Sequence, residues 1–298
     1  MKKGEMETKT DKKPANRIEK KYKDNKSIKS KIYNAILTTL FIVFILIFIY
    51  SAYKIVRWKI DSNNTKKEIK DINEKVTIKE VEDNDKTEII EQKDEIPEDN
   101  PYWDFIKVNL IDVDFSELLA TNKDTKGWIQ IAGTNINYPF VQTNNNSYYL
   151  THSFNKSYNE AGWVFMDYRN DIENFDKNTI IYAHGRWDNT MFGTLKNVFN
   201  NNWLNDPSNF IVKISTNHEN TLWQVFSVYR IKTTDDYIQV YFENSDAYQN
   251  FLNMITERSM HNFNTPVSTD DDILTLSTCY NETDKVVLHA KLIKKEVK

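Results

Sequence analysis

The sequence has very little cysteine: Cys279 is the only one among 298 residues. A single cysteine cannot form an intramolecular disulfide, so the stability of an exported domain must come from a packed core. Most lone cysteines are small buried hydrophobic residues. A thiol can also act as a nucleophile, and residues 274–278 favour a β-strand that would hold this one half exposed at a sheet edge.

The sequence also lacks any spacing typical of a metal site, has few glycines and has no arginine near its C-terminus. The five histidines are scattered, with no His-x-x-x-His pair and no cysteine cluster, so we expect no metal ion and no other cofactor. Five of the six glycines lie between Gly127 and Gly193, which leaves most other turns to Asn and Asp. No arginine follows Arg258, so the last forty residues rely on lysine for fixed positive charge.

Residues 32–53 contain no charged side chain. At 1.5 Å per residue, this run of 22 residues can cross a hydrocarbon core of about 30 Å. A cleaved signal peptide is disfavoured because the run is long and no small-x-small cleavage site follows it. We therefore expect a single-pass protein of the cell membrane with a transmembrane helix over these residues.

Residues 1–31 are strongly basic, with twelve Lys or Arg against five Asp or Glu. The positive-inside rule predicts that this tail is cytoplasmic and that the chain after the apolar run is extracytoplasmic. The tail lacks interleaved aromatic residues and adjoins the membrane span. Anionic membrane lipids are therefore its expected partner, and nucleic acid is not.

Residues 54–100 are acidic and poor in aromatic side chains. Ile69, Ile72 and Val76 have helical spacing and could form a short coil, but the composition favours a solvated extracytoplasmic stalk. The folded domain would then occupy residues 101–298.

Residues 101–298 have the pattern of a mainly β domain. Two short amphipathic helices are expected first, around residues 103–106 and 115–119. Short β-favouring runs follow, and their spacing indicates a β-barrel; they are residues 128–131, 138–142, 163–166, 179–182, 209–215, 221–232, 274–278 and 285–294. One strong helix interrupts them at residues 246–260, where the apolar side chains share one face.

Four segments carry a resemblance to a known family. In chain order they are residues 127–142, beginning Gly-Trp-Ile; residues 167–171, Asp-Tyr-Arg-Asn-Asp; residues 181–184, Ile-Tyr-Ala-His, with Met191-Phe192 following; and residues 275–279, Thr-Leu-Ser-Thr-Cys. Together they resemble the class B sortases, membrane-anchored cysteine transpeptidases of Gram-positive bacteria. The resemblance covers about residues 101–298. It implies a sortase-type β-barrel with N-terminal helices and one long helix before the cysteine strand.

The resemblance implies that Cys279 is the nucleophile and His184 the general acid and base. Attack on a peptide needs a proton donor for the departing amine, and His184 stands at the end of an apolar run where its side chain would reach a rim. A histidine in such a place is by itself more often a strand cap or a surface residue. The family often has Asn after the histidine, whereas this chain has Gly185-Arg186. His289, within an expected strand, is the second candidate.

The family's third residue is an arginine on the last strand, and alignment of residues 285–292 puts Lys285 at its position. A lysine supplies the charge as a point donor, without the planar fork of arginine. Three alternatives stay open. Arg186 or Arg230 reaches the oxyanion instead, the enzyme is impaired, or Lys285 is an ordinary exposed turn residue.

Four further residues are candidates for binding substrate. Ser277 precedes the cysteine by two residues and so faces the same side of its strand, with Thr278 between them. Tyr237-Ile238 resembles the class B loop that walls the sorting-signal groove, although a loop aromatic packed on the barrel is an equal alternative. The charged turn at residues 167–171 is interpreted as an ion-paired loop that supports the fold.

The expected function is the attachment of secreted proteins to the cell wall. Cys279 would attack the carbonyl of a Thr in a C-terminal sorting signal, and an amine of a cell-wall precursor would resolve the thioacyl enzyme. Other functions stay open: a pilus-type sortase that uses a pilin lysine as acceptor, a hydrolytic cysteine peptidase, or a sortase-like surface module that binds peptide without turnover. The missing arginine favours the last, and the retained Cys279 and His184 oppose it.

Overall fold

The structure is a computed structural model that describes residues 13–90, 96–173, 175–279 and 283–298. The chain divides into two units, Met1–Lys59 and Ile60–Lys298. Helix α1 (Lys13–Lys75) belongs to both, because its last turns are part of the second unit.

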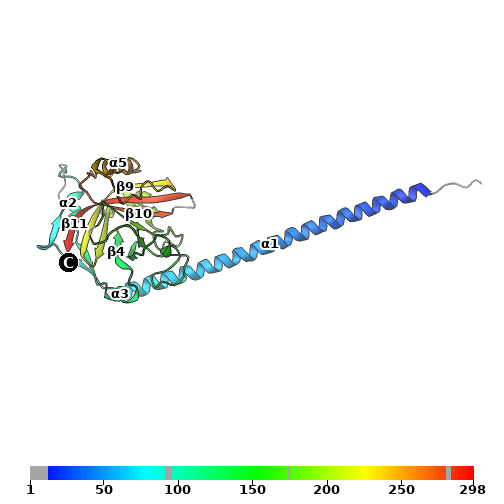
Figure 1. Ribbon diagram of the computed structural model, residues 1–298, viewed down its shortest axis with the longest axis horizontal. Helices are drawn as coiled ribbons and strands as arrows, with labels where there is room; N and C mark the ends of the chain where they lie inside the picture. Colours follow the sequence, from blue (N-terminus) through cyan, green and yellow to red (C-terminus); the bar gives the residue numbers. More distant parts are fainter. Residues whose placement is uncertain (1–12, 91–95, 174, 280–282) are drawn as a thin grey trace, which may run out of the picture. The chain divides into compact units, whose positions relative to one another are not determined.

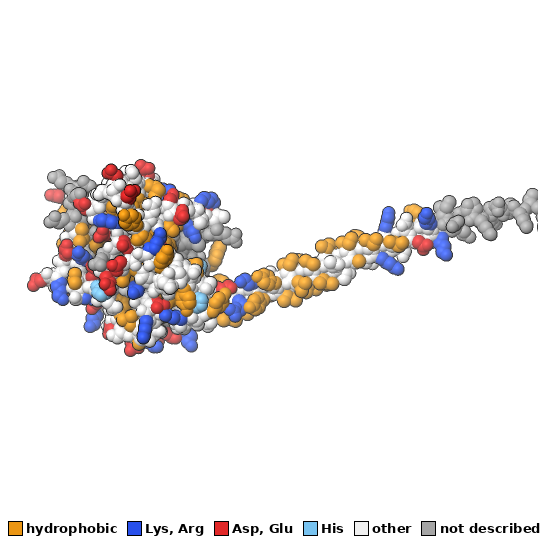
Figure 2. All heavy atoms as spheres, in the orientation of Figure 1, with side chains coloured by type: hydrophobic (Ala, Val, Ile, Leu, Met, Phe, Trp, Pro, Cys, Tyr) orange, Lys and Arg blue, Asp and Glu red, His pale blue; other side chains and the backbone are white. Residues whose placement is uncertain are grey.

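The apolar part of α1 has the length and composition of a membrane span. The apolar side chains of residues 32–53 are exposed. Figure 2 shows them as an orange band on the helix, with Lys and Arg side chains in blue at both of its ends. The helix is therefore consistent with the expected N-terminal membrane anchor.

The second unit is built on a closed barrel of eight strands (Figure 1), which confirms the predicted fold class. The strands are β4 (Thr125–Ile131), β5 (Asn137–Val141), β6 (Phe165–Met166), β7 (Asn178–Tyr182), β8 (Ile211–Thr216), β9 (Glu219–Lys232), β10 (Ile273–Cys279) and β11 (Asp284–Val297). Their order is β10-β7-β6-β5-β4-β8-β9-β11, and a β10–β11 pairing closes the ring. Two pairings, β5–β6 and β7–β10, are parallel, and the others are antiparallel.

The short helices lie where the apolar patterns indicated. The two expected near the start of the domain are α2 (Tyr102–Phe105) and α3 (Ser116–Thr121). The remaining short elements are α4 (Asn201–Leu204) and the 3-10 helices η1 (Tyr148–Leu150), η2 (Leu195–Phe199) and η3 (Pro207–Asn209).

The long helix predicted before the cysteine strand is α5 (Ser245–Glu257), which packs on the outside of the barrel (Figure 1). The Asn244 side chain caps it by accepting a hydrogen bond from the Ala247 N–H at 2.9 Å. Its buried face is the one that the sequence predicts, Tyr248, Phe251, Leu252 and Ile255. These side chains form a separate apolar cluster with residues of β9, β10 and β11.

The segment expected to be a solvated stalk, residues 54–100, is largely folded against the barrel, and the compact unit begins at Ile60 instead of residue 101. In α1, Ile72 is buried and Ile69 packs on the core, as does Val76 directly after the helix, so the helical spacing of these three residues marks a packed face. Two strands follow. β1 (Ile78–Val81) pairs with β3 (Leu110–Val113), and β2 (Thr87–Ile89) pairs with β11 outside the ring.

The packing of α5 predicts a stability effect. Leu252 is fully buried, so Leu252→Ala should lower the free energy of unfolding by about 2–5 kcal/mol. The neighbouring Asn253 is exposed, and Asn253→Ala should change it by no more than about 0.5 kcal/mol. Urea unfolding of the two variants measures the difference, and equal midpoints would contradict the described packing.

Candidate active site

The pairing of β10 on both of its edges brings the candidate residues to one end of the barrel. On the β7 side, Ser277 is opposite Tyr182 in a parallel register, and the Ala183 N–H donates to the Ser277 carbonyl, so the end of β10 runs beside the segment that leads into His184. On the β11 side, Cys279 is the direct register partner of Lys285. The side chain of Cys279 lies outside the described residues. Its backbone is nevertheless at the end of β10, opposite Lys285 and next to the strand that leads into His184.

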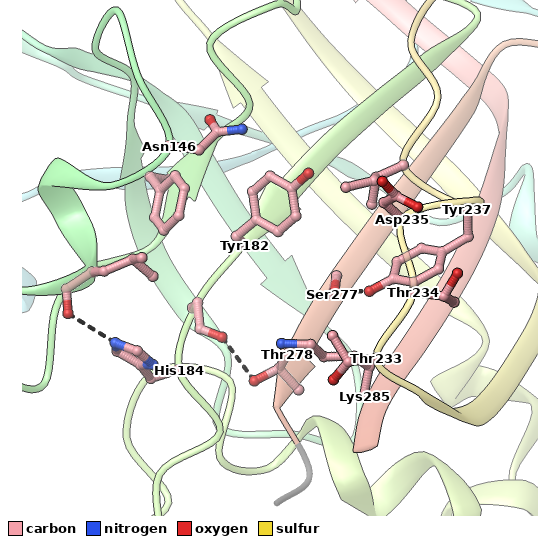
Figure 3. Close-up of a pocket in the computed structure, with 14 residues that line it drawn as sticks. Asn146, Tyr182, His184, Thr233, Thr234, Asp235, Tyr237, Ser277, Thr278 and Lys285 are labelled. Atoms are coloured by element: carbon pink, nitrogen blue, oxygen red, sulfur yellow. Dashed lines mark hydrogen bonds between the residues drawn. The ribbon is translucent and has the colours of Figure 1, made fainter. Parts of the chain in front are cut away.

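A groove of about 600 Å³ opens at this end of the barrel (Figure 3). All the candidate site residues with described side chains line it, and these are His184, Tyr237, Ile238, Ser277, Thr278 and Lys285. Sequence reasoning did not single out the remaining lining residues, which are Asn146, Leu150, Phe165, Tyr182, Ala183, Thr233, Thr234 and Asp235. The aromatic ones lie in predicted strands, but nothing in their spacing distinguishes a groove wall from core.

His184 is half-buried, and its ring is fixed by a main-chain acceptor. Nε2 lies 2.8 Å from the Leu150 carbonyl. A carbonyl only accepts, so Nε2 carries a hydrogen and Nδ1 is the nitrogen that gains or loses a proton. Burial lowers the pKa of His184 below its ordinary value of 6.5, and the nearby charges of Arg186 and Lys285 lower it further. The imidazole is therefore neutral at pH 7.

Gly162 makes room for this arrangement. Its φ is +61°, and a Cβ there would lie 2.4 Å from the Tyr149 carbonyl oxygen, 2.9 Å from that of Leu150 and 3.1 Å from Cδ2 of His184. A larger residue would displace the ring or its acceptor. The scarcity of glycine could have drawn attention to this position. The Leu150 carbonyl has no signal in the sequence, because any residue supplies one.

Among the three cations considered for the oxyanion, only Lys285 lines the groove. Arg186 donates to Asp188 and to the Thr190 hydroxyl at 3.1–3.2 Å. Arg230 forms an ion pair with Asp284 in which Nε lies 2.8 Å from Oδ2. Both guanidinium groups are thus engaged with carboxylates outside the groove lining.

The expected substrate-binding residues form the wall of the groove, and most are deeply set. Tyr237 is 2% exposed, and its hydroxyl lies 2.9 Å from Oγ of Ser277, which is 5% exposed. Thr278 donates its hydroxyl to the Ala183 carbonyl at 2.7 Å, which ties β10 to the end of β7 directly before His184. Ile238 is half-buried beside Tyr237. These contacts hold the wall in one shape.

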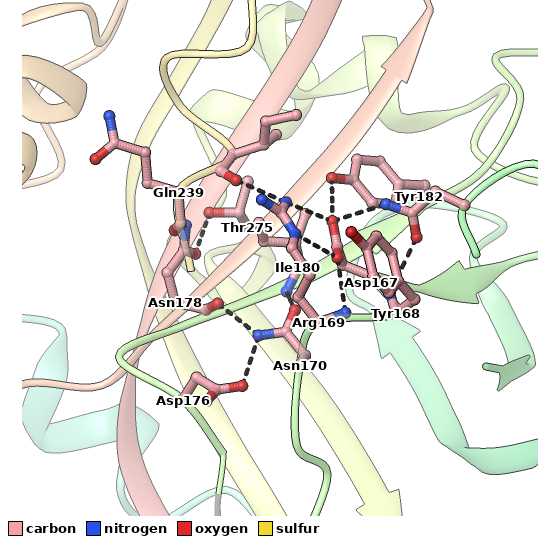
Figure 4. Close-up of polar contacts among 12 residues, drawn as sticks. Asp167, Tyr168, Arg169, Asn170, Asp176, Asn178, Ile180, Tyr182, Gln239 and Thr275 are labelled. Carbon is pink, nitrogen blue, oxygen red and sulfur yellow. Dashed lines mark hydrogen bonds and ion pairs between the residues drawn. The ribbon is translucent and has the colours of Figure 1, made fainter. Parts of the chain in front are cut away.

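The loop of residues 233–239, which supplies one wall, is fastened at several points. Arg258 at the end of α5 forms a two-bond ion pair with Asp236, at 2.8 and 2.6 Å. The Asn178 side chain donates to the Gln239 carbonyl at 2.8 Å (Figure 4).

The buried carboxylate of Asp167 connects this wall to the opposite one (Figure 4). It accepts hydrogen bonds from the Tyr182 hydroxyl and the Asn146 amide, each at 2.9 Å, and both residues line the groove. It also pairs with Arg169 through two bonds of 2.7–2.8 Å, and Arg169 donates onward to the Ile238 carbonyl at 2.9 Å. The charged turn therefore supports the fold, as interpreted from the sequence, and joins the two walls.

Burial would raise the pKa of Asp167, but hydrogen bonds from Arg169, Tyr182 and Asn146 outweigh burial, so the pKa lies below its ordinary value. The group stays a carboxylate and keeps accepting these bonds at neutral pH.

His289, the second histidine candidate, is fully buried away from the groove lining. Thr275 donates its hydroxyl to Oδ1 of Asn178 at 2.6 Å, so it accepts from Nδ1–H of His289 at 2.9 Å. The Tyr229 hydroxyl then donates to Nε2 at 2.9 Å. Burial lowers the pKa of His289 to about 3, and this neutral, fully bonded ring is structural.

The charges around His184 predict a titration change. Lys285→Gln removes a positive charge that disfavours the imidazolium form, so the pKa of His184 should rise. NMR titration of ring-labelled histidine in the full-length protein in detergent measures this pKa. Lys232→Gln is the matched control, because Lys232 is exposed and pairs with Asp284. An unchanged pKa in Lys285→Gln would contradict the electrostatic contact.

The chain is similar to known proteins over the barrel. The sortase domain family model matches residues 129–293. Sortase B of Staphylococcus aureus (strain NCTC 8325 / PS 47) is 39% identical over 184 residues, which are 60% of this chain and 75% of that protein. The family model therefore spans most of the barrel and leaves out the tail and the membrane helix.

Solved structures are also similar to this chain. A Staphylococcus aureus sortase B–substrate complex superimposes with a TM-score of 0.57 at 38% identity, covering 60% of this chain and 84% of that one. A sortase B complexed with triglycine gives the same TM-score and identity and covers 60% and 85%. The chain therefore belongs to the sortase family, within it to class B, and is a sortase-type cysteine transpeptidase.

Proposed function

We propose that the protein cleaves a C-terminal sorting signal after a Thr residue and transfers the secreted protein to an amine of a cell-wall precursor. The observation that carries this proposal is the pairing of β10, in which Cys279 is opposite Lys285 on one side and the preceding residues lie beside the end of β7, which leads into His184, on the other. The groove beside these positions has room for a short extended peptide.

In the first half-reaction, the proton of the Cys279 thiol passes to Nδ1 of His184, and the sulfur bonds to the Thr carbonyl carbon. The Lys285 ammonium stabilises the oxyanion of the tetrahedral intermediate. The carbon–nitrogen bond then breaks, and Nδ1 returns its proton to the leaving amine. A thioacyl enzyme remains, with the substrate lying against Ser277, Thr278, Tyr237 and Ile238.

In the second half-reaction, the acceptor amine attacks the thioester and gives its proton to Nδ1 of His184. The carbon–sulfur bond breaks, and the thiolate of Cys279 regains the proton. The solved complex of a sortase B with triglycine supports a glycine-like amine as acceptor. A pilin lysine, the acceptor of a pilus-type sortase, is the alternative that the same chemistry allows.

We further propose that residues 32–53 anchor the protein in the cell membrane of a Gram-positive bacterium. The tail of residues 1–31 would be cytoplasmic and contact anionic lipids, and the barrel would be extracytoplasmic. The apolar character of α1 and the excess of Lys and Arg before it support this orientation.

The direct test uses a fluorogenic peptide carrying a Thr scissile bond, with and without triglycine or a lysine-containing peptide as acceptor. We expect cleavage that accelerates with an amine, complete loss in Cys279→Ala, and a loss of about 10²–10⁴-fold in His184→Ala. Cleavage that persists in Cys279→Ala would overturn the mechanism. Water as the sole acceptor would indicate a peptidase, and binding without turnover would indicate a peptide-binding module.

The role of Lys285 makes a separate prediction. Lys285→Ala should lower kcat about 10²–10³-fold, the typical cost of losing one oxyanion donor. Lys285→Arg should keep or raise kcat because the guanidinium offers two donors. Arg230→Ala is the control, since Arg230 pairs with Asp284 outside the groove lining. Full activity in Lys285→Ala would contradict this role, and backbone amides would then have to stabilise the oxyanion.

A further inference from the structure

The first turns of α1 in the compact unit present buried polar side chains to the barrel. Asp61 is 4% exposed, Ser62 2% and Thr65 0%. Burying such groups costs free energy unless they are hydrogen-bonded, and each has a partner in the loops of the barrel domain. Two turns further on, the same helix is attached through the apolar side chain of Ile72. The polar contacts are directional, so they fix positions as well as attach the helix.

One of these contacts holds the loop that follows His184. Residues 185–191 leave the barrel at His184 and return where the Phe192 N–H donates to the His184 carbonyl at 3.0 Å. The Ser62 hydroxyl donates to Oδ2 of Asp188 at 2.5 Å. The same carboxylate accepts hydrogen bonds from side chains within the loop. Ser62 therefore binds the Asp188 carboxylate, around which the loop of residues 185–191 is organised.

The other contacts hold residues 150–162, the segment that contains the Leu150 carbonyl, which accepts the hydrogen bond from the His184 ring. Four hydrogen bonds join it to α1. Nδ2 of Asn159 donates to Oγ1 of Thr65 (2.9 Å) and to the Asp61 carbonyl (3.4 Å), the Glu160 N–H donates to the Asp61 carboxylate (3.4 Å), and the Asn155 N–H donates to the Glu68 carboxylate (2.8 Å). Within this segment, the Asn159 carbonyl accepts from the N–H of Gly162, against which the His184 ring packs. Leu150, whose carbonyl accepts from His184, lies at its start.

We propose that residues 61–68 of α1 are a positioning element for His184. They hold the loop of residues 185–191, which follows His184 in the chain, and the segment of residues 150–162, which orients its ring. The inference rests on the proposed function, in which Nδ1 of His184 transfers the proton. Proton transfer depends steeply on geometry, and a misplacement of about 1 Å can cost about 100-fold in rate. The segment between the membrane span and the barrel would then support the active site directly.

The test compares polar and apolar variants of the same helix in the full-length protein in detergent. Ser62→Ala combined with Thr65→Val removes both hydroxyls at nearly constant shape. We expect kcat for peptide cleavage to fall at least about tenfold with KM changed less than about twofold. The pKa of His184 should rise toward its ordinary value as burial of the ring is relaxed. Ser62→Thr, which keeps a hydroxyl, should restore most of the rate relative to Ser62→Ala.

The matched control is Ile72→Ala, which weakens the same helix–barrel interface without touching a polar contact. It should lower the melting temperature and leave kcat and the pKa of His184 unchanged when assayed well below that temperature. If the double variant lowers only the melting temperature, as Ile72→Ala does, α1 is a structural attachment and the proposal is overturned. If the double variant does not fold, the comparison of kcat and of the His184 pKa between Ser62→Ala and Ser62→Thr tests the proposal by itself.

The proposed function and the positioning role of residues 61–68 can be refuted separately. The pKa of His184 is read by NMR without any peptide. A wild-type protein that does not turn over the peptide, but whose His184 titration shifts in the double variant, would refute the proposed function and keep the positioning role. A wild-type protein that turns over the peptide, with no change of kcat or titration in the double variant, would refute the positioning role alone.

Discussion

The pairing of β10 with a strand on each side is the constraint on which the rest of this structure depends. Its parallel register with β7 brings the end of β10 beside the segment that leads into His184, and its antiparallel register with β11 puts Cys279 opposite Lys285. A slip of one residue would turn the alternate side chains to the other face of the strand. Closure of the barrel at β10 therefore fixes which residues meet at the groove, and the loops then determine its shape.

The groove is held by polar contacts on buried atoms, and this is why its walls have a defined separation. Asp167 joins Tyr182 and Asn146 on one wall to Ile238 on the other through Arg169. Each bond has little net value by itself, but a buried partner left unsatisfied costs about 1–3 kcal/mol. The network therefore favours one arrangement over looser ones. Asp167 and Arg169, which do not line the groove, still define the space that a substrate would occupy.

Local patterns in the sequence predicted much of this architecture. Short β-favouring runs predicted the barrel strands, the spacing of Tyr248, Phe251 and Leu252 predicted α5, and the end of an apolar run indicated His184 as a rim residue. What the sequence did not indicate depends on contacts between distant segments. Any residue has a carbonyl, so the sequence gives no signal for the one of Leu150. The acidic composition of residues 54–100 gave no sign of a helix face packed on the core or of two strands that pair with β3 and β11.

The central claim is that Cys279 forms a covalent thioacyl intermediate at the end of β10. Mass spectrometry of the intact full-length protein, quenched in acid during turnover of a sorting peptide, tests it most directly. The account predicts an added mass equal to the peptide portion ending in Thr, located on Cys279 after proteolysis and discharged faster when triglycine is present. No adduct during active turnover, or an adduct on another residue that persists in Cys279→Ala, would contradict it.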